Sequence, residues 1–168
     1  MRTRGTNWKR VAEHKFESES FLQQLLYDSP EVIPVASWGA ANLQPRIFVR
    51  EAGLPGSGSS DLIGIDEEGG ITVIECKLAA NPEVRRKVVG QLLEYAAYLW
   101  QMTYESFDAT CCRAEKWQGL HLADVMQQRM QESGAEYDEE EFRAGLEANL
   151  KAGNFTLIIA VDRLKDEL

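Results

Sequence analysis

Two short apolar segments on either side of an acidic, glycine-containing turn constrain the fold of this chain more than any other feature. The segments Asp61 to Asp66 and Ile71 to Lys77 are rich in isoleucine and valine, and Glu67-Glu68-Gly69-Gly70 separates them. β-Branched residues favour strands, and paired glycines allow a tight reversal of the chain. The sequence therefore predicts a β-hairpin.

The open end of this hairpin places charged residues on an apolar face. Because strand side chains alternate between two faces, Glu75 and Lys77 share a face with the apolar residues that precede them, and Asp61 does the same on the partner strand. Counting back from the turn places Asp61 opposite Glu75 or Cys76, with opposed Cβ atoms about 5 Å apart. Two carboxylates and an ammonium group are then expected at one end of a half-buried sheet.

This grouping of charges points to a metal-dependent reaction. Neighbouring carboxylates repel each other and are costly to bury unless a cation lies between them. Their oxygen atoms suit Mg²⁺ or Mn²⁺, and such an ion can activate water against a phosphodiester. In this interpretation Asp61 and Glu75 bind the ion, and Lys77 holds the attacking water. Burial could also lower the pKa of Lys77 enough for direct proton transfer. The alternative is a salt-bridged strand pair without chemistry.

The rest of the pattern indicates an α/β fold around the hairpin. Apolar spacing, capping residues and turn residues delimit the other elements. In chain order we expect a helix capped by Ser18 or Ser20 and ending near Tyr27, a strand from Arg46 to Glu51, a flexible loop from Gly53 to Ser60, the hairpin, a helix from about Glu83 to Tyr104, helices near Leu122–Glu132 and Asp138–Lys151, and a buried central strand from Phe155 to Val161. This order implies a mixed sheet flanked by helices.

Length and charge complete the organisation. We expect a basic arm over residues 1–15 and a single domain over residues 16–168, and a chain that stops soon after its last strand is also compatible with a piece of a longer protein. The net charge is −9, and residues 105–150 carry 11 acidic and 4 basic side chains. We interpret residues 105–151 as an acidic helical insertion. A solvated pair of helices is preferred, and the alternatives are a segment that covers the sheet, mediates assembly or limits which nucleic acid can enter. The overall acidity counts against tight, non-specific DNA binding.

The remaining candidate ligands and targeting features give mostly negative predictions. Three cysteines without a CxxC motif predict reduced thiols and neither a disulfide framework nor a zinc site. His14 and His121 have no metal-binding partner in the sequence pattern. No apolar run is long enough to cross a membrane, and no secretory segment is evident, so we expect a cytoplasmic protein without a membrane partner.

Three motifs together resemble a known family. They are Asp61-Leu62-Ile63, the strand end Glu75-Cys76-Lys77, and the helical sequence from Gly90 to Tyr95, which has the form G-Q-x-x-x-Y. In this combination the stretch Arg50 to Leu99 resembles the PD-(D/E)xK nuclease superfamily, and within it the NucS-like and resolvase-like nuclease domains. The resemblance implies a restriction-endonuclease-like αβββαβ core, an Mg²⁺ or Mn²⁺ cofactor, and a nucleic-acid partner, DNA.

The resemblance also implies roles for individual residues. It implies that Asp61, Glu75 and the Cys76 carbonyl bind the metal, that Lys77 organises the nucleophile, and that Gln91 reaches toward the same site. Further candidates come from less specific patterns. One is an acid from the first helix, where Glu19 is preferred to Glu17. Glu51, on the apolar face of its strand, is either a supporting group or only a charge at the strand end. The cluster Arg85, Arg86 and Lys87 either contacts phosphates or is ordinary surface charge.

Three functions remain open at this point. The first is a metal-dependent DNA endonuclease. The second is a catalytically silent domain of the same fold that binds nucleic acid or protein, and the third is an unrelated acidic interaction module. The sequence leaves open whether the chain forms a homodimer, and a DNA substrate is not distinguished from RNA.

Overall fold

The computed structural model describes residues 16–34, 44–54, 58–78 and 84–163. Four strands form one mixed sheet in the order β1-β2-β3-β4, in which β1, β2 and β3 are antiparallel neighbours and β4 runs parallel to β3. The elements are α1 (Glu19–Asp28), a 3-10 turn η1 (Pro30–Val32), β1 (Ile47–Leu54), β2 (Gly58–Ile65), β3 (Ile71–Lys77), α2 (Val84–Leu99), α3 (Tyr104–Glu115), α4 (Leu122–Ser133), α5 (Glu139–Ala152) and β4 (Phe155–Val161). The predicted α/β class and mixed sheet are confirmed.

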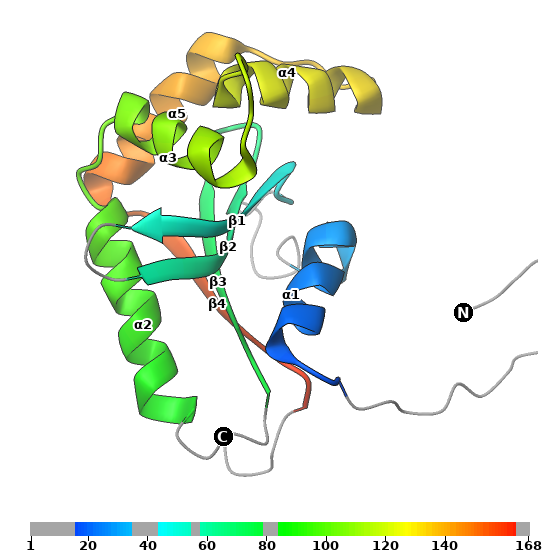
Figure 1. The fold of residues 1–168 in the computed structure, drawn as a ribbon. Helices are drawn as coiled ribbons and strands as arrows, with labels where there is room; N and C mark the ends of the chain where they lie inside the picture. The colour runs from blue at the N-terminus through cyan, green and yellow to red at the C-terminus, as the bar shows by residue number, and fades with distance from the viewer. Residues whose placement is uncertain (1–15, 35–43, 55–57, 79–83, 164–168) are drawn as a thin grey trace, which may run out of the picture.

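Helices cover both faces of the sheet (Figure 1). On one face, Leu22 and Leu26 of α1 pack against Leu62 and Ile74 of the two central strands. On the other, the side chains that alternate with these pack against α2 and α3, and the same cluster continues into α4 and α5. The sheet is therefore the middle layer of three, and its two faces bury different side chains of the same strands.

The predicted hairpin is present, with the register that the turn allows. Ile65 pairs with Ile71 and Leu62 pairs with Ile74, and the Asp66 carboxylate accepts hydrogen bonds from the N–H groups of Glu68 and Gly70. The strands β1 and β2 extend further than predicted, to Leu54 and from Gly58. All the described residues of the segment expected to be a flexible loop thus lie in strands, because Gly53 and Leu54 pair with Ser59 and Gly58.

The acidic segment 105–151 is not a solvated insertion. Phe107 of α3, Met126 of α4 and Leu146 of α5 are fully buried, and all three belong to the core cluster on the α2 face. The sequence also missed a helix boundary. The predicted long helix ends at Leu99, Gln101 adopts a left-handed φ of 62°, and Thr103 caps α3 by accepting from Ser106 N–H. Most of the acidic residues are exposed on the outer sides of helices whose inner faces are core, whereas Asp108 is buried and Glu115 is half-buried.

The last strand is an edge strand and not the predicted buried central one. Phe155–Val161 has the predicted bounds, but it lies at one end of the sheet and pairs only with β3 among the described strands. Its side chains Leu157 and Ile159 are exposed.

Among the described residues, no helix is both long enough and apolar enough to cross a membrane. The predicted basic arm lies outside the described residues.

Candidate functional site

The candidate site begins where the ladder between β2 and β3 ends. The last paired residues are Leu62 and Ile74, and continuing the register by one residue places Asp61 opposite Glu75. The Asp61 Oδ2 atom accepts a hydrogen bond from the backbone N–H of Cys76 at 2.7 Å. A carboxylate therefore takes the place of a strand carbonyl as acceptor, which holds Asp61 against β3 in the register that the sequence predicts.

The ammonium group of Lys77 lies between two acids. Its Nζ is 2.8 Å from Glu75 Oε1 and 3.4 Å from Glu19 Oε2. Glu19 begins α1, and its other oxygen accepts from the N–H of Leu78 at 3.2 Å. Glu17, the other acid considered from this region, is exposed. The structure thus places Glu19, the acid that was preferred to Glu17 from the sequence, at the end of β3.

A second contact fixes α1 to the strand that carries Asp61. The side-chain amide of Gln23 donates to the backbone carbonyl of Asp61 at 2.6 Å, and Gln23 is buried. Glu19 lies one turn before Gln23 on the same helix, so this bond helps to place the Glu19 carboxylate near Lys77. Nothing in the sequence pattern had indicated a role for Gln23.

Burial alters the proton affinities of this group. It raises the pKa of Asp61, and the nearby charges of Glu19 and Glu51 add to the effect, while the Cys76 N–H and Lys77 oppose it. Burial likewise raises the pKa of Glu75, against the opposing hydrogen bond from Lys77. Both carboxylates are therefore ionised at a free-energy cost that a bound cation would offset.

The surroundings of Lys77 favour its role in positioning water over direct proton transfer. Burial acts to lower the pKa of Lys77, but the hydrogen bond to Glu75 and the charges of Glu75, Asp61 and Glu19 outweigh it, so the pKa is raised overall. The lowered pKa that direct proton transfer requires is therefore not found in this arrangement. The protonated Lys77 can supply positive charge and hydrogen-bond donors.

Several buried oxygen atoms lack hydrogen-bond partners within the described structure. They include Oε2 of Glu75, whose side chain is 2% exposed, and Oε1 of Gln91 on α2. Tyr95, one turn after Gln91, donates to the Ser59 carbonyl at 2.9 Å. The pKa of Tyr95 is raised by burial and then by the charges of Glu75 and Asp61, so this side of α2 lies close to the carboxylates. Buried acceptors without a donor are what a cation site requires.

The side chain of Cys76 is on the opposite face from its acidic neighbours. It is fully buried with Leu62 and Ile74 in the cluster under α1, and burial followed by the charges of Asp61 and Glu75 raises its pKa to about 12. The thiol is therefore protonated and turned away from the carboxylates. Only the carbonyl group of this residue fits the metal-binding role that the resemblance implies.

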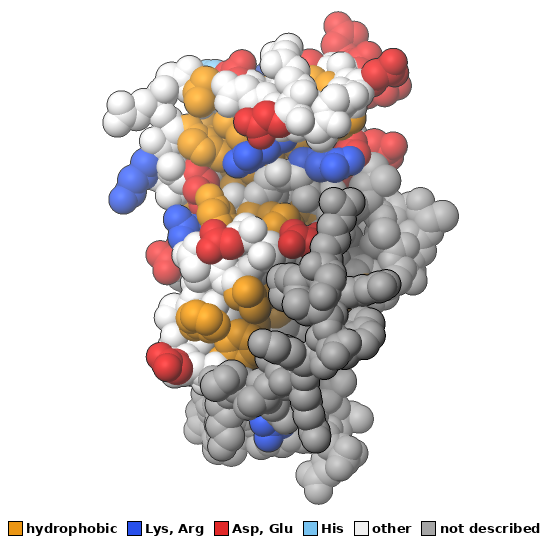
Figure 2. Space-filling view, turned by 90° about the vertical axis from the view of Figure 1, so that its right-hand side faces the viewer, with side chains coloured by type: hydrophobic (Ala, Val, Ile, Leu, Met, Phe, Trp, Pro, Cys, Tyr) orange, Lys and Arg blue, Asp and Glu red, His pale blue; other side chains and the backbone are white. Residues whose placement is uncertain are grey.

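Of the other predicted site residues, Glu51 lies near enough to Asp61 for its charge to raise the pKa of that carboxyl. Glu51 is exposed and adopts a φ of 48°, and Ala52 takes its place in the core on the α2 face. The expected position of Glu51 on the apolar face is wrong, because the left-handed residue interrupts the strand alternation. The side chains of Arg85 and Arg86 lie outside the described residues, and Lys87 is exposed. The described part of the face in Figure 2 mixes acidic and basic side chains and carries no continuous basic surface.

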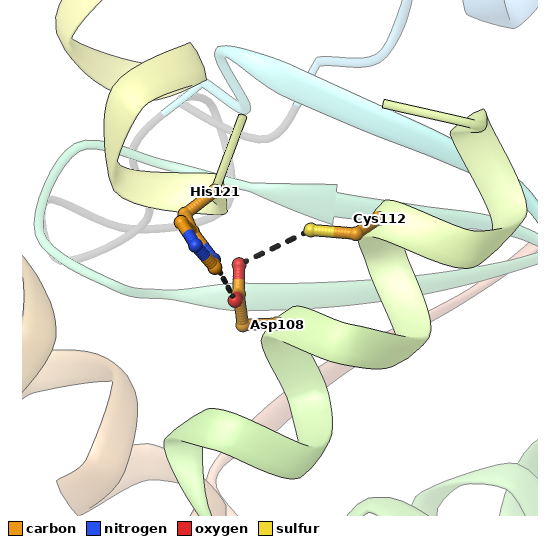
Figure 3. A group of neighbouring side chains, drawn as sticks. All are labelled: Asp108, Cys112 and His121. Carbon is orange, nitrogen blue, oxygen red and sulfur yellow. Dashed lines mark hydrogen bonds and ion pairs between the residues drawn. The ribbon is translucent and has the colours of Figure 1, made fainter. Parts of the chain in front are cut away.

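A different group could hold a metal ion, and the sequence interpretation missed it. Donor atoms of Asp108, Cys112 and His121 all lie within 4.8 Å of one another (Figure 3). No other set of three or more His, Cys, Asp or Glu side chains in the described ranges meets this distance, so Glu19, Asp61 and Glu75 do not form such a cluster. The Lys77 ammonium lies between Glu19 and Glu75 instead.

The group of Asp108, Cys112 and His121 was not predicted because the helix α3 was not predicted. Asp108 and Cys112 are one turn apart on α3, and His121 immediately precedes α4. A predicted helix over residues 104–115 would have placed the acid and the thiol on one face, four residues apart. The three thiols themselves are free, as predicted.

Comparisons with protein-family models, with curated proteins and with solved structures found no match for this chain.

Proposed function

We propose that this chain is a metal-dependent nuclease of the restriction-endonuclease-like class, which hydrolyses phosphodiester bonds in DNA. The observation that carries the proposal is the grouping of Asp61, Glu75 and Lys77 at the ends of two adjacent strands, with the Asp61 carboxylate bonded to Cys76 N–H and the Lys77 ammonium bonded to Glu75. These are the residues in which the sequence resembles the PD-(D/E)xK superfamily, and the order of α1, three strands, α2 and a late parallel strand supports the same class.

The donor set fits a hard divalent cation. Oε2 of Glu75 is buried and has no hydrogen-bond partner within the described structure, and burial raises the pKa of both carboxyl groups. Asp61, Glu75 and the Cys76 carbonyl would hold Mg²⁺ or Mn²⁺ through oxygen atoms alone. When bound, such a cation polarises a phosphodiester and makes a water molecule more acidic.

The chain's own side chains then have defined tasks. Lys77 stays protonated, so it donates hydrogen bonds to the attacking water and stabilises negative charge that develops on the phosphate. Glu19 and Glu75 fix the direction of its ammonium group. The amide oxygen of Gln91, buried and unpaired among the described contacts, is available to accept from that water or from a metal ligand.

Cleavage assays test the proposal directly. The purified full chain is incubated with plasmid, branched and single-stranded DNA, and with RNA, in the presence of Mg²⁺ or Mn²⁺. We expect cation-dependent cleavage of DNA that is lost in Lys77→Ala and retained in Lys151→Ala, a matched loss of an exposed lysine on α5. Thermal unfolding of both variants shows that they are folded. Equal cleavage by wild type and Lys77→Ala overturns the assignment.

One observation favours a second function, a catalytically silent domain of the same fold. The Lys77 ammonium is already paired with two acids, and the chain carries a net charge of −9. Mn²⁺ titration by calorimetry separates the two functions. The nuclease proposal requires Mn²⁺ binding that disappears in Asp61→Asn and Glu75→Gln, whereas a silent domain shows no binding that depends on these residues.

A further inference from the structure

The second candidate centre joins two elements at the top of the helical layer. Asp108 and Cys112 project from the same side of α3, and His121 is the residue before the first turn of α4 (Figure 3). The donors therefore come from both sides of the connection between the two helices. This centre uses none of the residues of the Asp61–Lys77 group, so it stands whether or not the chain is a nuclease.

The distances are close to those of a tetrahedral metal centre. His121 Nδ1 is 2.7 Å from Asp108 Oδ2, and Cys112 Sγ is 3.4 Å from Asp108 Oδ1. Zinc bonds of about 2.0–2.3 Å place neighbouring donor atoms of a tetrahedron about 3.3–3.6 Å apart. The contact of Cys112 with Asp108 already has this separation, whereas His121 contacts the other carboxylate oxygen at a shorter distance. The imidazole or the carboxylate therefore has to shift before one Asp108 oxygen can join both donors around an ion.

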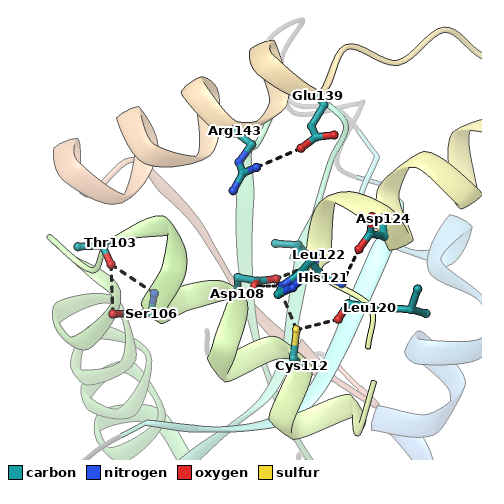
Figure 4. A network of polar contacts seen from close by, with 10 residues as sticks. All are labelled: Thr103, Ser106, Asp108, Cys112, Leu120, His121, Leu122, Asp124, Glu139 and Arg143. Carbon is teal, nitrogen blue, oxygen red and sulfur yellow. Dashed lines mark hydrogen bonds and ion pairs between the residues drawn. The ribbon is translucent and has the colours of Figure 1, made fainter. Parts of the chain in front are cut away.

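The surroundings hold the ligands in place without using all of their capacity. Oδ1 of Asp108 accepts the N–H of Leu122 at 2.6 Å, and the His121 N–H bonds to Asp124 Oδ2 at 2.8 Å (Figure 4). Capping of α4 explains the carboxylates, and the His121 side chain takes part in it by accepting from the Asp124 N–H, but capping requires no thiol. The Cys112 thiol lies 3.4 Å from Asp108 and 3.4 Å from the Leu120 carbonyl, which are ordinary distances for a sulfur donor.

The donor types select the metal. A thiolate, an imidazole and one carboxylate favour a borderline-soft cation such as Zn²⁺, whereas Mg²⁺ and Ca²⁺ prefer oxygen ligands alone. The His121 side chain is 72% exposed, so solvent reaches the centre from that side. We propose that Asp108, Cys112 and His121 bind one Zn²⁺ ion, which ties α3 to the start of α4 and keeps its fourth position for a water molecule or an external ligand.

Cobalt substitution tests this site in the full chain. The protein is prepared without a polyhistidine tag, freed of metal in a non-chelating reductant, and titrated with Co²⁺. We expect one equivalent to produce a thiolate-to-cobalt charge-transfer band and the strong visible bands of a tetrahedral ion, both removed by Zn²⁺ and unaffected by excess Mg²⁺. Absence of the charge-transfer band in the wild-type chain overturns the proposal without recourse to any variant.

Matched variants assign the band to these ligands. Cys112→Ser is expected to abolish it, and His121→Asn, which keeps a good helix-capping residue, is expected to weaken Co²⁺ binding more than about 100-fold, beyond the effect of losing an outer partner. Asp124→Asn removes a capping partner but no ligand, and Cys111→Ala removes the neighbouring buried thiol, so both keep the band. A band that survives Cys112→Ser, or that is lost in Cys111→Ala, contradicts the assignment.

Discussion

The carboxylate of Asp61 accepts the backbone N–H of Cys76 at 2.7 Å, one residue beyond the last paired rung of β2 and β3. A side chain therefore continues the sheet where the backbone ladder stops. This bond leaves the acid on the α2 face of the sheet with Glu75 and keeps its charge away from bulk water. Burying this charge is expected to lower the stability of the fold, and the free energy of unfolding of an uncharged variant measures the cost.

Asp61→Asn is expected to stabilise the metal-free chain. The amide oxygen can still accept from Cys76 N–H, while the charge whose burial raises the pKa of Asp61 is removed. The gain should be on the order of 1 kcal/mol, or about 2–4 °C in Tm for a chain of this size. Thermal unfolding at pH 7 without divalent cations measures it. A lower Tm for the variant would show that the ionised carboxylate stabilises the fold.

Two glycines in helices are expected to respond to alanine in opposite ways. A Cβ at Gly145 of α5 would collide with the backbone carbonyl of Glu68 in the hairpin turn, whereas a Cβ at Gly90 of α2 meets nothing within 4 Å. Gly90→Ala should add about 0.5–1 kcal/mol through helix propensity, and Gly145→Ala should cost about 1–3 kcal/mol through overpacking. Urea unfolding of the two variants tests this contrast, and stabilisation by both would mean that α5 does not pack on the turn.

Neighbouring acids in the hairpin turn should give opposite pH dependences. Burial raises the pKa of Asp66 despite its hydrogen bonds from Gly70 and Glu68. The folded chain then binds a proton more readily than the unfolded chain at this position, so ionised Asp66 lowers stability above its folded pKa. Asp66→Asn is expected to raise the free energy of unfolding at pH 7, with the gain vanishing as the pH falls below the ordinary value of 3.8.

Glu67 supplies the internal control for that measurement. Burial is the largest influence and acts to raise its pKa, but the hydrogen bond from Arg46, a backbone hydrogen bond and the charge of Arg46 together outweigh burial, so the pKa is lowered overall. The stabilisation of the fold by ionised Glu67 is therefore fully present above its ordinary pKa of 4.5, and it is lost as the pH falls through the lowered pKa of the folded chain. Glu67→Gln should lower stability at pH 7 by less than about 1 kcal/mol, since the pair is partly exposed. Unfolding curves for both variants over roughly pH 2.5 to 7 should diverge in opposite directions.

The helical segment after α2 is expected to be indispensable to the fold. Phe107 of α3 is 0% exposed, while Phe21 of α1 is 56% exposed. Phe107→Ala should cost about 3–5 kcal/mol, and Phe21→Ala, the same chemical change at an exposed position, should cost well under half as much. Denaturant unfolding compares them. Equal losses of stability in the two variants would mean that residues 105–151 are a peripheral insertion and not part of the core.

Local patterns predicted much of this fold. The hairpin and the bounds of the strand from Phe155 to Val161 follow from the alternation and turn residues of short segments. The cap of α1, expected at Ser18 or Ser20, is Ser18. The opposition of Asp61 and Glu75 follows from the hairpin alone, because turn and strand lengths fix the register. These are properties that neighbouring residues decide.

Features that depend on distant parts of the chain were not predictable in this way. The edge position of β4 depends on which strand it joins, and its apolar sequence does not contain that information. The break at Gln101 was concealed because Met102 continues the helical spacing three residues after Leu99. The ion pair of Lys77 with Glu19 depends on how a distant helix packs, and the Asp108 centre depends on a helix whose acidic composition suggested a solvated segment.

The parallel pairing of β3 with β4 also constrains how the chain is made. Ile71 pairs with Phe155, and all four helices from α2 to α5 lie between these residues in the chain. Closing so long a connection is slow, and an unpaired strand edge can join the wrong neighbour. During synthesis on the ribosome, the edge of β3 that pairs with β4 therefore stays unpaired until residues 155–161 emerge. We expect chaperone dependence to be greatest in that interval.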